Sequence, residues 1–271
     1  MADRSNPPLA GQTPRLTGKR IVITRGPEQA LELGEALIAL GAQVLLLPLV
    51  EFSPVWDSEN LDAALSRQAQ FDAILFLSAN AVRYVFERCR NLGVPFDAQH
   101  KPRIVVAIGA ATARALANEE VRADYVARES TSSALAKELK DSLVGKSVLL
   151  PRSDRGSESA PLALVEIGAL VTEVVAYRTG MPKSIDAMVA ARVSSGEVDA
   201  IVFSSPSAVK NFVAVFCDAA AARLGQRTKF AAIGPTTAQA LRSENLPVAI
   251  EAAESSTDGL VDALVRAFAA Q

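Results

Sequence analysis

The chain has few of the residues on which most metal and nucleophile chemistry depends. Its 271 residues include one histidine, His100, and two cysteines, Cys89 and Cys217. A single histidine excludes multi-histidine metal sites and makes a Ser-His-Asp triad a poor hypothesis, and the cysteines lack the spacing of zinc ligands. We interpret His100 as a solvated loop residue. We interpret the cysteines as buried, reduced thiols, with a single disulfide as the minor alternative.

Aromatic residues and long apolar runs are scarce as well. Aromatics make up 5% of the chain and hydrophobic residues 49%, so its cores must be built from Ala, Val, Leu and Ile, as is usual in parallel-sheet proteins. No apolar run approaches the roughly 18 residues of a membrane span. Residues 1–15 lack the apolar segment of a signal peptide, so we expect a disordered tail and a cytoplasmic protein. The net charge of −2 favours neither nucleic acid nor anionic membranes, so any anion site must be local.

Three segments of the sequence recur at a nearly constant offset of 125 to 127 residues. Residues 18–25 match 145–152, residues 72–82 match 199–209, and residues 108–116 match 233–241. A period this long indicates a duplicated domain, because solenoid repeats are roughly 20–50 residues long. Two similar lobes usually face each other across a cleft, and such clefts are preferred ligand sites.

Short apolar runs alternate with helical patterns along the chain. The expected strands are 20–24, 73–77, 104–108, 125–126, 147–150, 170–178, 200–203, 230–233 and 248–250. Gly41 and Gly168 mark the ends of the helices that follow the strands at 20 and 147. This alternation with short loops predicts an α/β fold with two similar, doubly wound parallel-sheet lobes.

Two long extended stretches, residues 43–55 and 169–179, predict a two-stranded β linker between the lobes. Pro48 lies inside the first of them, and proline is confined to strand edges because it cannot donate to a ladder. The repeat then predicts one lobe from residues 16–50 plus 177–271 and another from residues 51–173.

Small polar residues follow most of the expected strands, where open α/β sheets bind their ligands. Backbone N–H groups at such helix starts attract anions, although each loop alone is more simply read as a helix cap. The candidates for anion binding are Arg25, Ser78, Ala79, Asn80, Gly109, Arg152, Ser205, Ser207, Gly234, Thr236 and Thr237. No P-loop or Gly-x-Gly-x-x-Gly fingerprint is present, so nucleotide binding has weak support.

Tyr177 ends the second linker stretch and is expected to overlook the cleft; the alternative is an interfacial packing residue. Tyr84, on a helix, is expected to pack in a core. Asp72 and Asp199 directly precede strands, and we interpret them as cap or turn residues.

These motifs together resemble the uroporphyrinogen-III synthase family, and the resemblance covers residues 16–268. It rests on Ile23-Thr24-Arg25, Leu46-Leu47-Pro48, Phe76-Leu77-Ser78-Ala79-Asn80-Ala81-Val82, Val174-Val175-Ala176-Tyr177-Arg178-Thr179, Phe203-Ser204-Ser205-Pro206-Ser207-Ala208-Val209 and Ala232-Ile233-Gly234-Pro235-Thr236-Thr237-Ala238.

The resemblance implies a lyase that cyclises hydroxymethylbilane to uroporphyrinogen III, with inversion of ring D and loss of water, in haem biosynthesis. It implies no cofactor and no metal. Tyr177 would donate a hydrogen bond to the leaving hydroxyl, and the candidate anion-binding residues would hold the substrate's eight carboxylates. We expect a monomer, and a transient hand-off of the unstable substrate from hydroxymethylbilane synthase.

Two alternatives belong to other classes. A non-catalytic two-lobe small-molecule binding module would share the hinge and the cleft. A duplicated response-regulator-like domain would need an acidic cluster at a strand end, and the sequence has none there.

Overall fold

The structure is a computed structural model that describes residues 15–55, 57–127, 132–216, 221 and 223–269. The predicted tail up to residue 14 and Cys217 lie outside the described residues. The chain divides into a discontinuous unit, Met1–Glu51 with Met181–Gln271, and a continuous unit, Phe52–Gly180. Residues 177–180, expected in the discontinuous lobe, therefore belong to the continuous unit, where Tyr177 packs in the core. The predicted cleft between the lobes stays a prediction.

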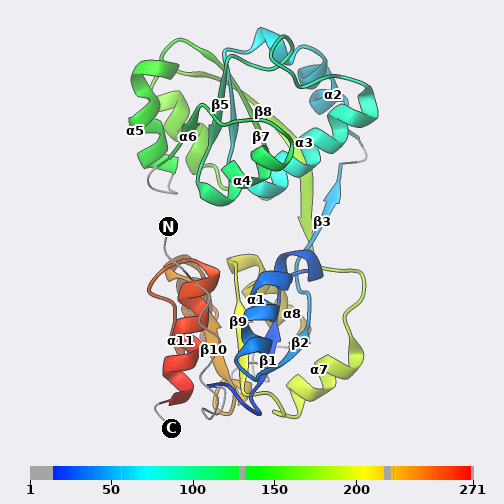
Figure 1. Ribbon diagram of the computed structural model, residues 1–271, viewed down its shortest axis with the longest axis vertical. Coiled ribbons are helices and arrows are strands. Elements are labelled where there is room, and N and C mark those ends of the chain that lie inside the picture. The colour runs from blue at the N-terminus through cyan, green and yellow to red at the C-terminus, as the bar shows by residue number, and fades with distance from the viewer. Residues whose placement is uncertain (1–14, 56, 128–131, 217–220, 222, 270–271) are drawn as a thin grey trace. The chain divides into compact units, whose positions relative to one another are not determined.

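The discontinuous unit is a five-stranded sheet in the order β11-β10-β9-β1-β2, with all neighbours parallel (Figure 1). Its elements are β1 (Arg20–Ile23), α1 (Pro27–Ala39), β2 (Gln43–Leu46), α7 (Ala187–Ser194), β9 (Ala200–Phe203), α8 (Pro206–Phe216), β10 (Lys229–Ala232), α10 (Pro235–Ser243), β11 (Ile250–Glu251) and α11 (Thr257–Ala269). The strand before Pro48 is at the sheet edge, as predicted.

The continuous unit is a six-stranded sheet in the order β3-β8-β7-β4-β5-β6. Its elements are β3 (Glu51–Pro54), α2 (Glu59–Ser66), the 3-10 helix η1 (Gln68–Gln70), β4 (Ala73–Phe76), α3 (Ala79–Leu92), β5 (Ile104–Ala107), α4 (Ala110–Asn118), β6 (Tyr125–Val126), α5 (Ser132–Leu143), β7 (Ser147–Ser153), α6 (Ser159–Glu166) and β8 (Leu170–Gly180). The edge strand β3 runs opposite to β8, whereas the other described pairings are parallel (Figure 1).

The duplication appears in the strand pairing of the two units. Replacing β6, β5, β4, β7 and β8 by their repeat equivalents β11, β10, β9, β1 and β2 converts one strand order into the other. Ala73 pairs with Val148, and Ala200 pairs with Ile21, which is the same contact shifted by the repeat. The predicted fold class, with two doubly wound parallel sheets, is confirmed. Sequence analysis missed the equivalent short helices α2 and α7.

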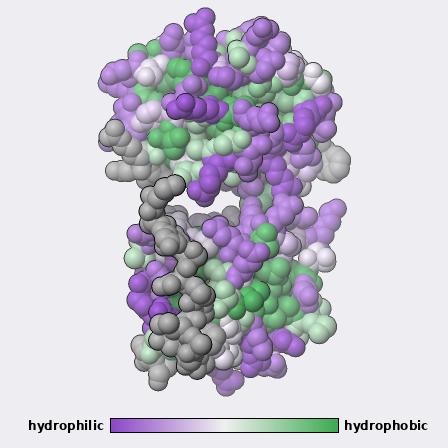
Figure 2. Space-filling view, viewed as in Figure 1, coloured by the Kyte–Doolittle hydropathy of each residue, from purple (hydrophilic) through white to green (hydrophobic). Residues whose placement is uncertain are grey.

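Helices cover both faces of the central strands, so neighbouring residues of one strand enter different cores. Ile74 and Phe76 join the core under α2, α3 and α4, while Ala73 and Leu75 join the core under α5 and α6. Four consecutive apolar residues are therefore buried, as in other parallel sheets. Hydrophilic residues cover much of the visible surface of each unit (Figure 2).

Three smaller predictions also have an outcome. Cys89 is a free, buried thiol, and burial raises its pKa to about 11, which keeps it protonated and unreactive. His100 is an exposed loop residue whose Nδ1 lies 2.7 Å from Asp97 Oδ1. Gly41 and Gly168 follow α1 and α6 with φ of 86° and 87°, where a side chain would be strained.

Among the described helices, none combines the length and apolarity that a membrane span requires.

An aspartate joins the two central strands of each sheet at their amino ends. Asp72 accepts hydrogen bonds from the Ser147 N–H and hydroxyl, both at 2.9 Å. Asp199 accepts the equivalent bond from the Arg20 N–H at 2.8 Å. Hydrogen bonds from Ser147 hold the pKa of Asp72 below its ordinary value, with a smaller contribution from the charge of Lys146. The two aspartates therefore connect strands, which refines their predicted role as caps or turns.

Asp72→Asn is expected to lower the thermal midpoint at neutral pH. A carboxylate whose pKa is depressed by folding stabilises the protein above its unfolded pKa of about 3.9, and this stabilisation is lost as pH falls through the folded pKa. The difference from the unmodified chain should therefore shrink in acid. Thermal melts at several pH values would measure it, with Asp141→Asn, an exposed residue of α5, as the control. A pH-independent difference would contradict this account.

Candidate functional site

Each unit gathers its predicted site residues at one edge of its sheet. In the continuous unit, β4, β5, β7 and β8 are parallel neighbours, so their carboxyl ends meet at the same edge. Ser78 follows β4 as the N-cap of α3, and Gly109 follows β5 as the N-cap of α4. Ala79 and Asn80 form the first turn of α3. Tyr177 lies near the end of β8, where it pairs with Ser153 of β7.

The side chains of Ser78 and Tyr177 meet at this edge. Their hydroxyl oxygens are 3.0 Å apart, and either can be the donor. Ser78 Oγ also accepts the Ala81 N–H at 3.0 Å, which caps the start of α3. The serine is therefore both the cap that sequence analysis offered as the simple reading and a partner of the candidate catalytic group.

The Tyr177 ring lies in the core, and its hydroxyl meets the Ser78 hydroxyl. The residue is 6% exposed and packs with the core that α3 covers. Burial is the main cause that raises the pKa of Tyr177; the charge of Asp154 adds to it, and the Ser78 hydrogen bond opposes it. The phenol is therefore a neutral hydrogen-bond donor at physiological pH. The buried ring agrees with the predicted alternative of a packing residue, and the hydroxyl that meets Ser78 agrees with the predicted functional role.

Arg152 is engaged within its own unit, contrary to the expectation that it is available to a ligand. Its guanidinium bonds to the carboxylates of Glu158, at 2.8 Å, and of Glu173, and to the Gly156 carbonyl. Its side chain is only 11% exposed. Sequence analysis could not find these partners, because they depend on the pairing of β7 with β8 and on the loop after β7.

The discontinuous unit presents a second set at the carboxyl ends of β1, β9 and β10, which are parallel neighbours. The set consists of Arg25 after β1, Ser205 and Ser207 at the start of α8, and Gly234, Thr236 and Thr237 at the start of α10. Ser205 Oγ accepts the Ala208 N–H at 3.2 Å, as Ser78 does for its helix.

Arg25 differs from its repeat equivalent Arg152. In the part of the chain that the structure describes, its guanidinium has no hydrogen bond or ion pair, although it is half-buried. Burial lowers the pKa of Arg25, and the charge of Glu32 partly opposes this. An arginine remains protonated even so, because its ordinary pKa lies far above physiological pH. Arg25 is thus a partly desolvated cation whose donors are available to an anion.

The other residues of this edge contribute mainly backbone. Thr237 is 3% exposed, so its side chain is core and only its N–H can face a ligand. A Cβ on Gly234 would lie 2.0 Å from Ser255 Oγ, so the glycine lets the loop between β11 and α11 pack closely against the start of α10. Sequence analysis missed Ser204, whose buried Oγ has no partner among the described residues.

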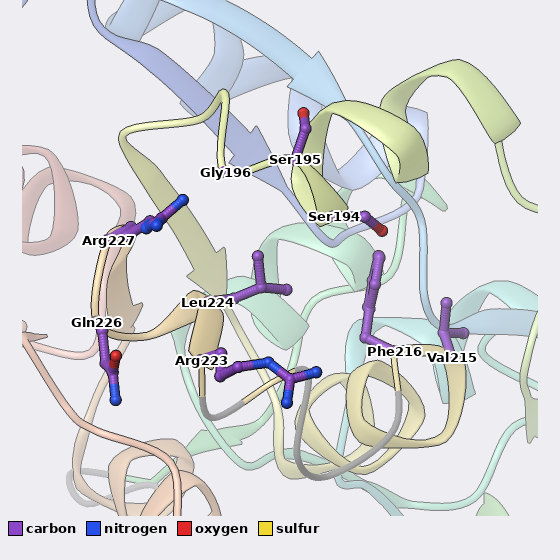
Figure 3. A pocket seen from close by; sticks show the side chains of 9 residues that line it. All are labelled: Ser194, Ser195, Gly196, Val215, Phe216, Arg223, Leu224, Gln226 and Arg227. Atoms are coloured by element: carbon purple, nitrogen blue, oxygen red, sulfur yellow. The ribbon is translucent and has the colours of Figure 1, made fainter.

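A pocket of about 400 Å³ lies elsewhere in the discontinuous unit (Figure 3). Its lining includes Gly196, which precedes β9, and Arg227, which precedes β10, so it opens at the amino ends of the strands. Phe216 and Leu224 supply apolar walls. Ligands of open parallel sheets bind at the opposite, carboxyl edge. We therefore place the candidate site with the predicted residues.

Comparison with known proteins gives consistent matches over most of the chain. The family model described as uroporphyrinogen-III synthase HemD matches residues 32–262. Uroporphyrinogen-III synthase from Synechococcus elongatus is 33% identical over 264 residues, which are 92% of this chain and 95% of that protein. A putative uroporphyrinogen-III synthase from Methanothermobacter thermautotrophicus is 29% identical over 236 residues, 83% of this chain and 90% of that protein.

Two solved structures support the fold. A mutant uroporphyrinogen III synthase from the extremely thermophilic bacterium Thermus thermophilus aligns with a TM-score of 0.64 at 23% identity, covering 94% of this chain and all of that one. The synthetase from Helicobacter pylori aligns with a TM-score of 0.61 at 19% identity, covering 92% and 99%. The fold, the family model and the curated relatives agree, and the chain belongs to the uroporphyrinogen-III synthase family.

Proposed function

We propose that this chain closes hydroxymethylbilane to uroporphyrinogen III, with inversion of ring D and release of one water, as a lyase of haem biosynthesis. Family membership over most of its length supports the reaction. The observation that carries the assignment of residues is the hydroxyl pair of Tyr177 and Ser78 at the carboxyl edge of the continuous unit.

The reaction needs help mainly at the leaving group. The C–O bond of the hydroxymethyl group breaks as the adjacent pyrrole nitrogen supplies its electron pair, and an azafulvene remains. The substituted carbon of ring D attacks this carbon to give a spiro centre. That centre fragments and recloses with ring D turned over, and a proton is then lost. Water is a far better leaving group than hydroxide, so a donor beside the departing oxygen accelerates the first step.

Tyr177 is suited to be that donor. We assign a relay in which the Ala81 N–H bonds to Ser78 Oγ, the Ser78 hydroxyl donates to the Tyr177 oxygen, and the Tyr177 hydroxyl donates to the leaving oxygen. Each bond polarises the next one. The geometry allows this direction, because either hydroxyl of the pair can be the donor.

The remaining candidates would orient the chain of four pyrroles. The substrate also closes spontaneously to the uninverted isomer, so the enzyme must select the geometry that leads to inversion. Arg25 offers a cation that is unpaired in the described part of the chain, and helix starts offer N–H groups to carboxylates at Ser205, Ser207, Gly234, Thr236 and Thr237. Ala79, Asn80 and Gly109 do so in the continuous unit.

We further propose that the enzyme works in the cytoplasm as a monomer and receives its unstable substrate directly from hydroxymethylbilane synthase. The absence of a spanning helix among the described residues is compatible with this setting.

A coupled assay tests the proposed reaction. The protein is mixed with freshly generated hydroxymethylbilane, the products are oxidised, and the type I and type III porphyrins are separated. Predominantly type III product is expected. Type I alone, at the spontaneous rate and from folded protein, would support the non-catalytic binding module instead.

Tyr177→Phe is expected to lower kcat by about 10²-fold, at the lower end of what general-acid assistance contributes, while the product stays type III. The ring remains in the core, so the thermal midpoint should change little. The ratio of kcat for the unmodified chain to kcat for Tyr177→Phe should be constant between about pH 6 and 9, because the raised pKa keeps Tyr177 protonated throughout. Tyr125→Phe is the matched control on an unrelated tyrosine. Turnover equal to that of the unmodified chain would remove Tyr177 from the mechanism.

Arg25→Ala and Arg152→Ala are expected to have different effects despite their equivalent positions. Loss of Arg25 should raise KM by about tenfold, the value of one charge-assisted hydrogen bond, with little effect on stability. Loss of Arg152 leaves Glu158 and Glu173 without their partner, so it should lower the thermal midpoint and leave KM nearly unchanged. Steady-state kinetics and melts of both variants measure this. Equal KM effects would show that both arginines bind substrate.

A further inference from the structure

The Tyr177 ring is held by two other aromatic residues from separate elements. Tyr84 of α3 stacks on it, with ring centroids 5.3 Å apart and planes within 14° of parallel. Phe52 of β3 meets it edge to face, with centroids 5.8 Å apart and planes at 68°. Tyr84 is 5% exposed. The other aromatic clusters of the described residues consist of phenylalanines, whereas this one surrounds a ring whose hydroxyl meets Ser78.

The fold itself does not require this aromatic cluster. The discontinuous unit repeats the order of every strand of the continuous unit except β3, and its residues equivalent to Tyr84 and Tyr177 are Asn211 and Val50. There the helix is tied to the linker segment by a hydrogen bond, from Asn211 Nδ2 to the Leu49 carbonyl, at 2.6 Å. One copy thus joins helix and linker through a polar contact, and the other joins them through stacked rings.

We propose that Tyr84 and Phe52 are positioning residues, which fix the plane of the Tyr177 ring so that its hydroxyl stays on Ser78 and points to the leaving oxygen. This inference rests on the proposed function of Tyr177. Stacking limits tilting of the ring, and the edge contact limits its sliding along β8. Misplacement of a catalytic group by about 1 Å costs up to 10²-fold in rate. Loss of the ring of Tyr84 or of Phe52 is therefore expected to lower the rate by a measurable part of that factor.

The stacked ring also keeps water from the phenol. Burial is the largest cause of the raised pKa of Tyr177, and Tyr84 covers a face of its ring. The pKa of Tyr177 therefore reports whether the cluster is intact, and it can be measured without substrate.

The test is a double-mutant cycle with Tyr84→Phe as the reference, because phenylalanine keeps the stacked ring. Tyr84→Leu should lower kcat by about tenfold relative to Tyr84→Phe, with KM within about twofold. In a Tyr177→Phe background the same change should cost less than about twofold, because no hydroxyl remains to be positioned. Phe52→Leu should also lower kcat when Tyr177 is present. Equal losses in both backgrounds, or no loss in either, would overturn the inference.

Ultraviolet titration supplies the readout that does not depend on activity. In a Tyr125→Phe background, replacing Tyr84 by Phe or by Leu leaves Tyr177 as the only tyrosine. The titration midpoint should be lower in the Leu variant, and an unchanged midpoint would count against the cluster. If Tyr177→Phe alone is fully active while these midpoints still differ, the proposed function of Tyr177 fails and the packing described here stands.

Discussion

Each unit depends on one pairing between strands that are far apart in the sequence. In the continuous unit β4 pairs with β7, and in the discontinuous unit β1 pairs with β9 across the whole of the inserted continuous unit. Loop-closure entropy grows only with the logarithm of loop length, so the long insertion adds little to the cost of this pairing. Asp72 and Asp199 reinforce the two pairings with hydrogen bonds at equivalent positions. The carboxyl ends of the neighbouring strands then meet at one edge, where the candidate residues collect.

Much of this arrangement is predictable because the repeated segments occur twice in the sequence, so a strand or helix assigned in one copy can be checked in the other. The strand at residues 200–203 was predicted with its observed ends, and Ser78 and Ser205 were found at helix starts because polar residues follow apolar runs there. The lobe boundary at the second linker was misplaced, since β8 continues to Gly180 and carries Tyr177 with it. The helices α2 and α7 were missed, although α6, which also has eight residues, was predicted from the glycine that follows it.

The site contacts were not predictable, because they join residues that no local pattern connects. Phe52, Tyr84 and Tyr177 come from three elements and meet only once β3 and β8 are paired and α3 covers them. The engagement of Arg152 likewise requires Glu158 and Glu173 to be brought to it by the fold. A repeat in the sequence suggests equal roles for equivalent residues, whereas tertiary packing decides which copy of a residue remains available.

The duplicated edges have therefore diverged in a way that suits a reaction controlled by orientation. One edge keeps Arg25, which has no hydrogen-bond or ion-pair partner among the described residues, and helix starts that offer N–H groups; these properties suit the binding of several carboxylates. At the other edge Arg152 is paired with Glu158 and Glu173, and the Tyr177 hydroxyl lies against Ser78. Burial and the charge of Asp154 both disfavour the ionised form of the phenol, which agrees with the proposed role of Tyr177 as a donor. Arg152 is paired with Glu158 and Glu173, whereas Arg25 has no such partner among the described residues, so we expect one copy of the duplicated fold to bind anions at its edge and the other to donate a hydrogen bond.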